Sequence, residues 1–210
     1  MLNRDIAEAV RLMAPGTHAI LVYDSQENKR DVLFSHLKYG AGRAGLVYVC
    51  TEETPEAIKS EMDGFGVDTK GLEAEGDLSV KKYDEVYVVD GKVDTPKIIN
   101  SFAFLASEYK ERGKEGIRAG AEMNCFFREN KVPELIHYEN ALHTSLSFPA
   151  KGICAYNLVE MGNSGNLELI WPLIRAHGLV IMTGPNGSFA LPPPEVEKDV
   201  VEATIRAVAR

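Results

Sequence analysis

Short apolar runs alternate along the chain with segments whose apolar residues recur every three or four positions. The short runs predict strands at 18–23, 46–50, 152–156 and 178–183, and the more polar stretches 78–82 and 117–122 continue the alternation as further strands. The periodic segments predict helices at 4–13, 27–39, 133–147 and 195–208, with further helices opened by Pro55 and Pro96. A helix around 167–174 contains Pro172, which we expect to bend or split it.

Strands that alternate with helices are typical of a mostly parallel sheet covered on both faces. The sequence therefore predicts an α/β fold of three layers. Asn186-Gly187 is a turn signal that would return residues 188–191 as an antiparallel edge strand. We expect one domain over residues 1–210, with a core at about 17–191 and the helices at 4–13 and 195–208 as extensions.

The segment after the first strand lacks the glycines of a phosphate-binding loop. Residues 24–30 read Asp-Ser-Gln-Glu-Asn-Lys-Arg, and no glycine stands between Gly16 and Gly40. A phosphate loop needs glycines so that backbone N–H groups can close around the phosphates, and it ends in Lys followed by Ser or Thr. The usual cradle for a nucleotide is therefore missing from this position.

The composition and net charge argue against several classes of binding partner and of structural site. The 210 residues are 45% apolar, enough for a substantial core, and the net charge of −8 predicts no dispersed attraction to nucleic acid or anionic lipid. The 3 cysteines lack CxxC spacing, which argues against a disulfide framework or a structural zinc site. No apolar stretch resembles a signal peptide or a membrane span, so we expect a cytoplasmic protein.

Several short motifs follow one another in an order that resembles a known family. Gly40–Glu53, with its glycine-rich start and acidic end, precedes Gly64–Asp68 and Gly76–Val80, as in the KaiC-like branch of the RecA ATPases. Further motifs are spread over most of the chain: His18, Glu85–Tyr87, Gly116–Glu122, Tyr138-Glu139, Cys154–Tyr156 and His177. With these, roughly residues 17–191 resemble most closely the MEDS family, the sensory domain of DcmR-type regulators in methanogens and methylotrophs.

The resemblance carries an expectation about function. It implies a degenerate RecA-like fold without a phosphate loop, used to sense a small molecule that is a hydrocarbon derivative or a C1-type compound. DcmR-type regulators also carry an output segment, and no helix-turn-helix or kinase pattern is evident in this sequence. Signal output is therefore expected to pass through a protein partner or through self-association, without direct contact to nucleic acid or membrane.

Candidate ligand-binding residues lie where ligands of parallel sheets bind, at the carboxyl ends of the strands. Tyr23, Glu122 and Tyr156 each stand at or near such an end, and Cys154 shares a sheet face with Tyr156 because the two are two positions apart. Cys125 stands in a connecting segment, where it either lines a pocket or packs in the core. We expect one pocket that combines a carboxylate, aromatic hydroxyls and a thiol.

Glu139 places an acid on the apolar stripe of the helix at 133–147. A buried acid needs a cation, a hydrogen-bond donor or a proton, which is frequent at functional sites, although a bond to a loop amide is the simpler alternative. His18 and His177 each precede a strand, which predicts a place near the opposite rim, where they either bind the ligand or bond to the backbone. Together with Cys154 these residues are a chemically possible metal set, but HxH, HExxH and CxxC spacings are absent, so we predict no metal and no cofactor.

Four charged residues are candidates for a residual nucleotide site. Glu52 and Glu53 follow the second strand, where an acidic pair activates water in the ATPases that this chain resembles, and their alternative role is to favour the positive end of the helix dipole. Lys29 and Arg30 either meet an anion at the start of their helix or lie on its solvated face.

Three functions remain open at this stage. The first is a noncatalytic ligand-binding sensory module. The alternative is a KaiC-like nucleotide binder or ATPase with an altered phosphate site, which needs the four charged residues to replace the lost backbone donors. A third is an interaction scaffold that self-associates through a sheet edge.

Overall fold

A mixed seven-stranded sheet is the centre of the protein in the computed structural model, which describes residues 3–184 and 187–208. The strand order is β3-β2-β4-β5-β1-β6-β7. The strands are β1 (His18–Tyr23), β2 (Gly45–Cys50), β3 (Leu78–Lys82), β4 (Ile117–Glu122), β5 (Ala150–Asn157), β6 (Leu179–Met182) and β7 (Phe189–Leu191). Only the β6–β7 pair is antiparallel within the described ranges. The predicted α/β class and edge hairpin are thus confirmed, although Asn186 of the predicted turn lies outside the described residues.

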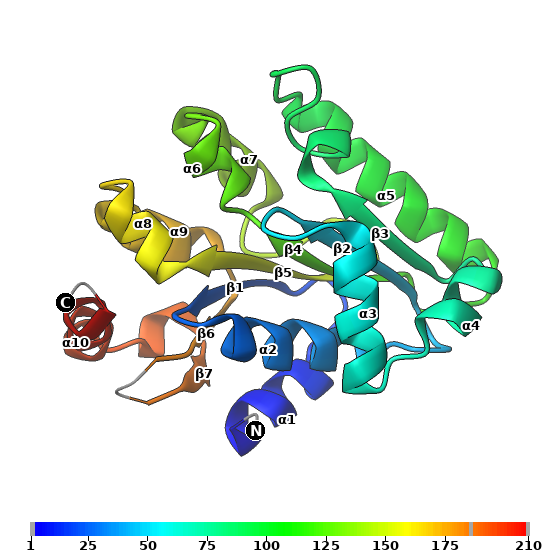
Figure 1. Cartoon of the computed structure of the whole chain (residues 1–210), viewed down its shortest axis with the longest axis horizontal. Helices are drawn as coiled ribbons and strands as arrows, with labels where there is room; N and C mark the ends of the chain where they lie inside the picture. The colour runs from blue at the N-terminus through cyan, green and yellow to red at the C-terminus, as the bar shows by residue number, and fades with distance from the viewer. Residues whose placement is uncertain (1–2, 185–186, 209–210) are drawn as a thin grey trace.

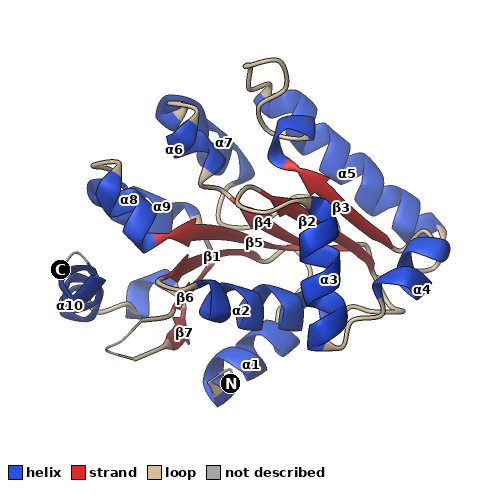
Figure 2. Ribbon diagram, viewed as in Figure 1, coloured by secondary structure: helices blue, strands red, loops and turns tan. Residues whose placement is uncertain are grey.

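Helices cover both faces of the sheet, which gives the three layers visible in Figures 1 and 2. One face carries α1 (Arg4–Leu12), α2 (Gln26–Lys38), α3 (Pro55–Phe65) and α4 (Thr69–Ala74). The other carries α5 (Thr95–Glu111), α6 (Cys125–Arg128), α7 (Val132–Leu142), α8 (Leu158–Asn163), α9 (Ile170–Ala176) and α10 (Lys198–Val208). Short 3-10 turns lie at Tyr83–Glu85, Leu167–Leu169 and Pro193–Glu195.

Alternation along the strands divides the core between these two faces. On β5, Cys154 and Tyr156 belong to the core under α7 and α9, whereas Ile153 and Ala155 belong to the core under α2. Both β1 and β5 are buried on both sides, as expected of central strands in a parallel sheet. Successive residues of a strand point to opposite faces, so the position of a polar residue along its strand decides which face of the sheet its side chain lies on.

Two helices depart from the sequence prediction. The helix expected over 133–147 ends at Leu142, because the following segment joins the start of β1 instead: Thr17 forms an antiparallel bridge with Ser145, and Leu146 N–H donates to the carbonyl of Gly16 at 2.7 Å. Pro172 was expected to bend or split its helix. It lies in the first turn of α9, where a missing N–H breaks no helical bond, and the change from 3-10 to α geometry comes earlier, after Leu169.

None of the helices in the described part of the chain combines the length and apolarity that a bilayer span requires.

Candidate functional site

Lys29 occupies the space beside the end of β1 where a phosphate loop would lie. Ser25 caps α2 by accepting a hydrogen bond from Asn28 N–H, so the helix starts only a short turn after the strand. The first helical turn thereby places Lys29 over the sheet, with its side chain fully buried. Its Nζ lies 2.6 Å from Glu122 Oε1 and 3.1 Å from Glu52 Oε2. We call Lys29, Glu52 and Glu122, with their polar neighbours, the Lys29 cluster.

Glu122 receives hydrogen bonds on both carboxylate oxygens. Tyr48 OH donates to Oε1 at 2.7 Å, and the backbone N–H groups of Thr51 and Glu52 donate to Oε2 at 2.7 and 2.9 Å. Burial, followed by the charge of Glu122, raises the pKa of Tyr48 well above its usual value, so its hydroxyl stays a donor. The carboxylate therefore needs no further partner.

Glu52 is satisfied in the same way. Tyr23 OH and Asn124 Nδ2 donate to Oε1 at 3.1 and 3.0 Å, and Gln26 donates to Oε2 beside Lys29. Burial by itself raises the pKa of Glu52, but the ammonium of Lys29 and these hydrogen bonds bring the pKa below its ordinary value. Both carboxylate oxygens of Glu52 thus already accept hydrogen bonds from neighbouring side chains.

The remaining two candidates of the nucleotide site pair with each other. Arg30 Nη2 lies 2.8 Å from Glu53 Oε1, and Arg30 Nη1 lies 3.4 Å from Glu61 Oε2. Both Arg30 and Glu53 keep about a quarter of their side chains exposed, at 27% and 26%. The structure therefore brings Lys29, Arg30, Glu52 and Glu53 together, with each cation already neutralised by a carboxylate.

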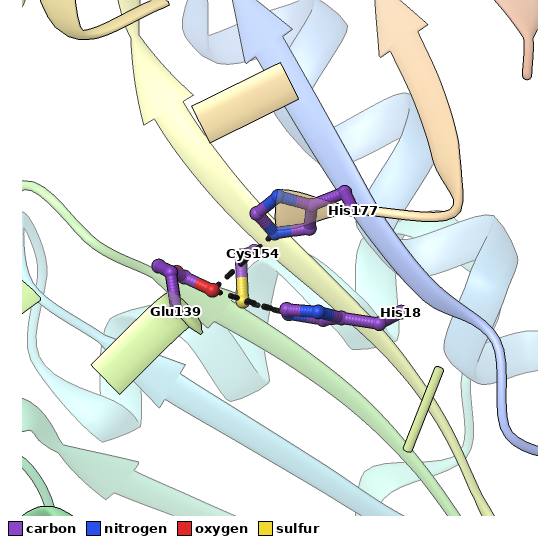
Figure 3. A group of neighbouring side chains, drawn as sticks. All are labelled: His18, Glu139, Cys154 and His177. Carbon is purple, nitrogen blue, oxygen red and sulfur yellow. Dashed lines mark hydrogen bonds and ion pairs between the residues drawn. The ribbon is translucent and has the colours of Figure 1, made fainter. Parts of the chain in front are cut away.

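A second polar group lies on the opposite face of the sheet. His18 at the start of β1, Glu139 on α7, Cys154 on β5 and His177 just before β6 converge, as Figure 3 shows. One ligand-type atom of each lies within 4.8 Å of the others, and all four side chains are buried. We call these four residues the His–Glu–Cys cluster.

Glu139 links the two imidazoles. Its Oε2 lies 3.2 Å from His18 Nε2 and 3.4 Å from His177 Nε2, and its other oxygen accepts a hydrogen bond from Tyr156 OH. Cys154 Sγ lies 3.5 Å from His18 Nε2. The rings of His18 and His177 are neighbours, with centroids 4.0 Å apart.

Backbone carbonyls determine the tautomer of both histidines. His18 Nδ1 lies 2.7 Å from the carbonyl of His143, and His177 Nδ1 lies 2.7 Å from that of Leu173. Because a carbonyl oxygen only accepts, both Nδ1 atoms carry the hydrogen, and in a neutral ring Nε2 presents a lone pair. Glu139 Oε2 and His177 Nε2 are buried and have no hydrogen-bond donor among the described residues.

The charges in this cluster follow from burial and proximity. Burial, helped by the neighbouring His18, lowers the pKa of His177 to about 3. Burial raises the pKa of Glu139, but the positive charge of His177 and His18 in their protonated forms, together with hydrogen bonds from His18 and Tyr156, outweighs this effect and brings the pKa to about 2. Burial and the charge of Glu139 raise the pKa of Cys154. The carboxylate of Glu139 thus lies between two imidazoles and a thiol.

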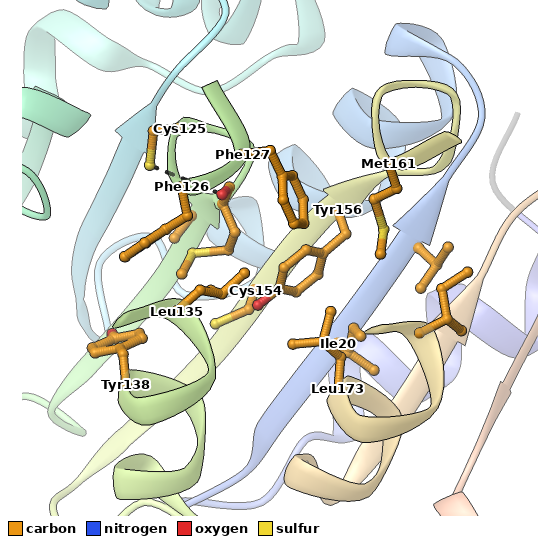
Figure 4. Packing of buried hydrophobic residues seen from close by; sticks show 14 of the residues in the cluster. Ile20, Cys125, Phe126, Phe127, Leu135, Tyr138, Cys154, Tyr156, Met161 and Leu173 are labelled. Atoms are coloured by element: carbon orange, nitrogen blue, oxygen red, sulfur yellow. Dashed lines mark hydrogen bonds between the residues drawn. The ribbon is translucent and has the colours of Figure 1, made fainter. Parts of the chain in front are cut away.

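A small apolar cavity of about 40 Å³ adjoins the cluster at His18 and Cys154. Its wall is otherwise aromatic and aliphatic, with residues from β4, β5, α5, α7, the segment before α5 and the segment after α7: Tyr87, Phe102, Ile117, Ala119, Ala121, Tyr138, Leu142, Leu146, Phe148, Ala150, Gly152 and Ile153. Figure 4 shows how Tyr138, Cys154 and Tyr156 stand in the adjoining core. A site for one water needs about 10–15 Å³ on this measure, so the cavity has room for a molecule of a few heavy atoms.

The sequence led us to expect one pocket at the strand ends, and the structure separates its members. Tyr23 and Glu122 lie on the α2 face in the Lys29 cluster, whereas Cys154 and Tyr156 lie on the α7 face beside Glu139. The register explains this division, because Tyr156 pairs with Val22 and shares its face, leaving Tyr23 on the other. Cys125 is buried in α6, outside the cavity lining.

The two histidines correct a second expectation. They lie at strand starts, as predicted, but Glu139 and Cys154 extend to them, so the four possible ligands do meet. Sequence reasoning also missed Tyr48 and Asn124 of the Lys29 cluster and the aromatic cavity wall. Asn124 was findable, because it stands two residues beyond the end of β4, where polar side chains of parallel sheets gather.

Comparisons with known proteins agree with this architecture. The KaiC-like protein PH0186 of Pyrococcus horikoshii OT3 is similar in structure, with a TM-score of 0.53 and 17% identity over 81% of this chain and 72% of that one. A second protein of Pyrococcus horikoshii OT3, PH0250, gives a TM-score of 0.61 at 8% identity over 93% of this chain and 95% of that one. At these identities the likeness shows a shared KaiC-like RecA fold alone.

The comparison with curated proteins gave no match. The family model described as the methanogen/methylotroph DcmR sensory domain, MEDS, matches residues 17–171, which is most of the chain. That stretch contains the whole Lys29 cluster, the cavity wall and every member of the His–Glu–Cys cluster except His177. The chain belongs to the MEDS family of sensory domains.

Proposed function

We propose that this protein is a noncatalytic sensory module that binds a small, mostly apolar molecule in the cavity beside His18 and Cys154. The observation that carries the proposal is the cavity itself: an aromatic and aliphatic wall ending in an imidazole and a thiol. Small-molecule sites are commonly apolar with a few placed polar groups that orient the ligand. A hydrocarbon derivative or C1-type compound with one polar or soft atom matches both its size and its chemistry.

The cavity is coupled to an exposed segment that could report occupancy. Residues 143–149 connect α7 to β5, and Leu146 and Phe148 of this segment form part of the cavity wall. The carbonyl of His143, a residue held at a φ of 58°, accepts the hydrogen bond from His18. A ligand that moves His18 or the two apolar side chains therefore shifts a surface segment, which supports output through a protein partner or self-association.

The Lys29 cluster disfavours the alternative of nucleotide binding. Lys29 and Arg30 are already paired with Glu122, Glu52 and Glu53. A phosphate entering here would displace satisfied carboxylates and meet their negative charge, without the backbone donors that a glycine loop supplies. The cluster therefore acts as a structural replacement for the phosphate site in this proposal.

Thermal unfolding tests the two functions against each other. We expect methanethiol, dimethyl sulfide or a halomethane to raise the melting temperature, since a ligand that binds only the folded state stabilises it. Millimolar Mg-ATP is expected to leave the melting temperature unchanged and to release no phosphate. A shift with Mg-ATP and none with the small apolar probes would reverse the assignment.

A matched pair of glycine variants locates the binding. In Gly152→Ala the new methyl enters the cavity with only an ordinary contact, 3.5 Å from Leu146 Cδ1, so the variant should fold and bind the probes more weakly. Gly120→Ala adds the same methyl on the other face, 3.5 Å from Leu33, and should bind like the wild type. Equal probe binding by both variants would place the ligand elsewhere.

A further inference from the structure

We propose that His18, Glu139, Cys154 and His177 form a binding site for one borderline divalent metal ion, with zinc as the best match. The site lies inside the α7 face of the sheet and brings together two imidazole nitrogens, one carboxylate oxygen and one sulfur. The four residues come from β1, α7, β5 and the segment before β6, which are far apart in the sequence. No short sequence motif therefore contains the site.

Three distances between the ligand atoms match tetrahedral coordination. Zinc bonds of about 2.0–2.2 Å to nitrogen and oxygen and about 2.3 Å to sulfur, at tetrahedral angles, put ligand atoms about 3.3–3.6 Å apart. The distances from Glu139 Oε2 to His18 Nε2 and His177 Nε2 are 3.2 and 3.4 Å, and Cys154 Sγ lies 3.5 Å from His18 Nε2. These three of the six pairwise distances match the tetrahedral range, and all four atoms lie within 4.8 Å of one another, so an ion binds after a modest inward movement of the wider pairs.

The hydrogen-bond pattern favours a positive charge between these side chains. Both Nδ1 hydrogens are used on backbone carbonyls, so in neutral rings the Nε2 lone pairs of His18 and His177 face the carboxylate of Glu139. In that state acceptors face acceptors, and Glu139 Oε2 and His177 Nε2 have no donor among the described residues, although both side chains are at least 99% buried, at 1% and 0% exposure. One thiol hydrogen from Cys154 can satisfy only one of these acceptors. A cation satisfies all of them together.

The surroundings also match those of a metal site. Ligating histidines usually donate their other ring N–H to a carbonyl or carboxylate, which fixes the ring, and both histidines do so here. Tyr156 OH holds the second oxygen of Glu139 and so orients the carboxylate. When the ion binds, the thiol proton of Cys154 passes to solvent, and carboxylate and thiolate together balance a 2+ charge.

The donor set selects the class of metal. Magnesium and calcium prefer cages of oxygen ligands, whereas imidazole combined with thiolate suits zinc and other borderline ions. The cavity borders the cluster at His18 and Cys154, so a ligand atom held in the cavity lies beside the bound ion. The contact between such a ligand and the ion rests on the function proposed above. The metal site itself does not depend on that function.

Cobalt substitution tests the site in the full, untagged chain. After treatment with a chelator, we expect Co²⁺ to saturate at one equivalent, with the intense visible absorption of a tetrahedral ion and a near-ultraviolet thiolate-to-cobalt band. Zn²⁺ should remove both signals by displacement. Weak octahedral absorption without a thiolate band would overturn the proposal, whatever the small apolar probes do in the melting experiment.

Variants assign the ligands. Cys154→Ser should lose the near-ultraviolet band, whereas the double variant C50S/C125S, which removes the other buried cysteines, should keep it. Tyr156→Phe should weaken Zn²⁺ affinity by about 10–100-fold, since it removes a support of a ligand and not the ligand itself. If Cys154→Ser fails to fold, the double variant decides alone: loss of its band while folded would place the thiolate elsewhere and overturn the assignment.

Discussion

Lys29 Nζ lies 2.6 Å from Glu122 Oε1, and both side chains are completely shielded from solvent. In a chain with a phosphate loop, the cation near this position would face an anionic ligand. Here the protein supplies the anion itself, from the end of β4. The pair therefore neutralises both buried charges and joins α2 to the sheet.

Removal of one partner of this pair should destabilise the fold strongly. Lys29→Met leaves Glu122 as a buried charge beside Tyr48 and two backbone donors, and we expect a loss of about 3–5 kcal/mol in the free energy of unfolding. Urea denaturation measures the loss. The control is Arg30→Met, whose partly exposed pair with Glu53 should contribute about 0–1 kcal/mol. Equal losses in the two variants would mean that the buried pair has no special weight.

His36 should make stability depend on pH. Burial, followed by the charge of Arg118, lowers the pKa of His36 to about 3, while its Nε2 donates to the carbonyl of Lys151 at 3.0 Å. The unfolded chain takes up this proton near its ordinary pKa of about 6.5, so the unfolded state binds more protons between these values. The contribution of His36 is complete above about pH 6.5 and is lost progressively as the pH falls towards 3, by up to about 1.4 kcal/mol per pH unit.

The variant His36→Gln isolates this effect, because its amide can keep the donor to Lys151 without titrating. Urea midpoints measured from pH 7.5 to pH 4 should fall less steeply for His36→Gln than for the wild type. Parallel curves for the two proteins would show that His36 takes up its proton equally in both states.

Gly116 allows the start of β4 to approach β5 closely. A Cβ at this position would lie 1.8 Å from the carbonyl oxygen of Pro149, and its φ is +108°. Gly116→Ala should therefore destabilise the protein by about 3 kcal/mol or more, since neither backbone can move without breaking the strand pair. Gly113→Ala is the control: its φ is +79° and its Cβ meets nothing within 4 Å, so only the left-handed strain of about 1–2 kcal/mol remains. Differential scanning calorimetry that ranks the two losses the other way would contradict the packing explanation.

Metal loading should stabilise the folded chain if the His–Glu–Cys cluster binds an ion. At free Zn²⁺ of 100 times the dissociation constant, linkage gives about 2.7 kcal/mol, which thermal melting detects as a rise over the chelator-treated protein. Cys154→Ser should lose most of this rise, whereas Cys125→Ser, a buried cysteine outside the cluster, should keep it. An equal rise in both variants would point to Zn²⁺ bound elsewhere.

Prediction from sequence succeeded where local pattern decides the structure. The apolar run 18–23 and the alternating segment 117–122 are the strands β1 and β4, with the predicted bounds. It failed where a distant segment competes with local preference. Residues 143–147 have helical spacing but pair with Gly16 and Thr17, because the backbone bonds available there replace those of another helical turn.

The sequence by itself determined the α/β order of elements, the MEDS resemblance and the absence of a phosphate loop, since each depends on neighbouring residues and their spacing. Only the tertiary structure decided which residues share a site. Tyr23 and Tyr156 both stand near strand ends, yet the register turns them to opposite faces, while His18 and His177 at strand starts meet Glu139 of α7. Strand register and helix placement depend on contacts between distant segments, and no pattern within one segment encodes them.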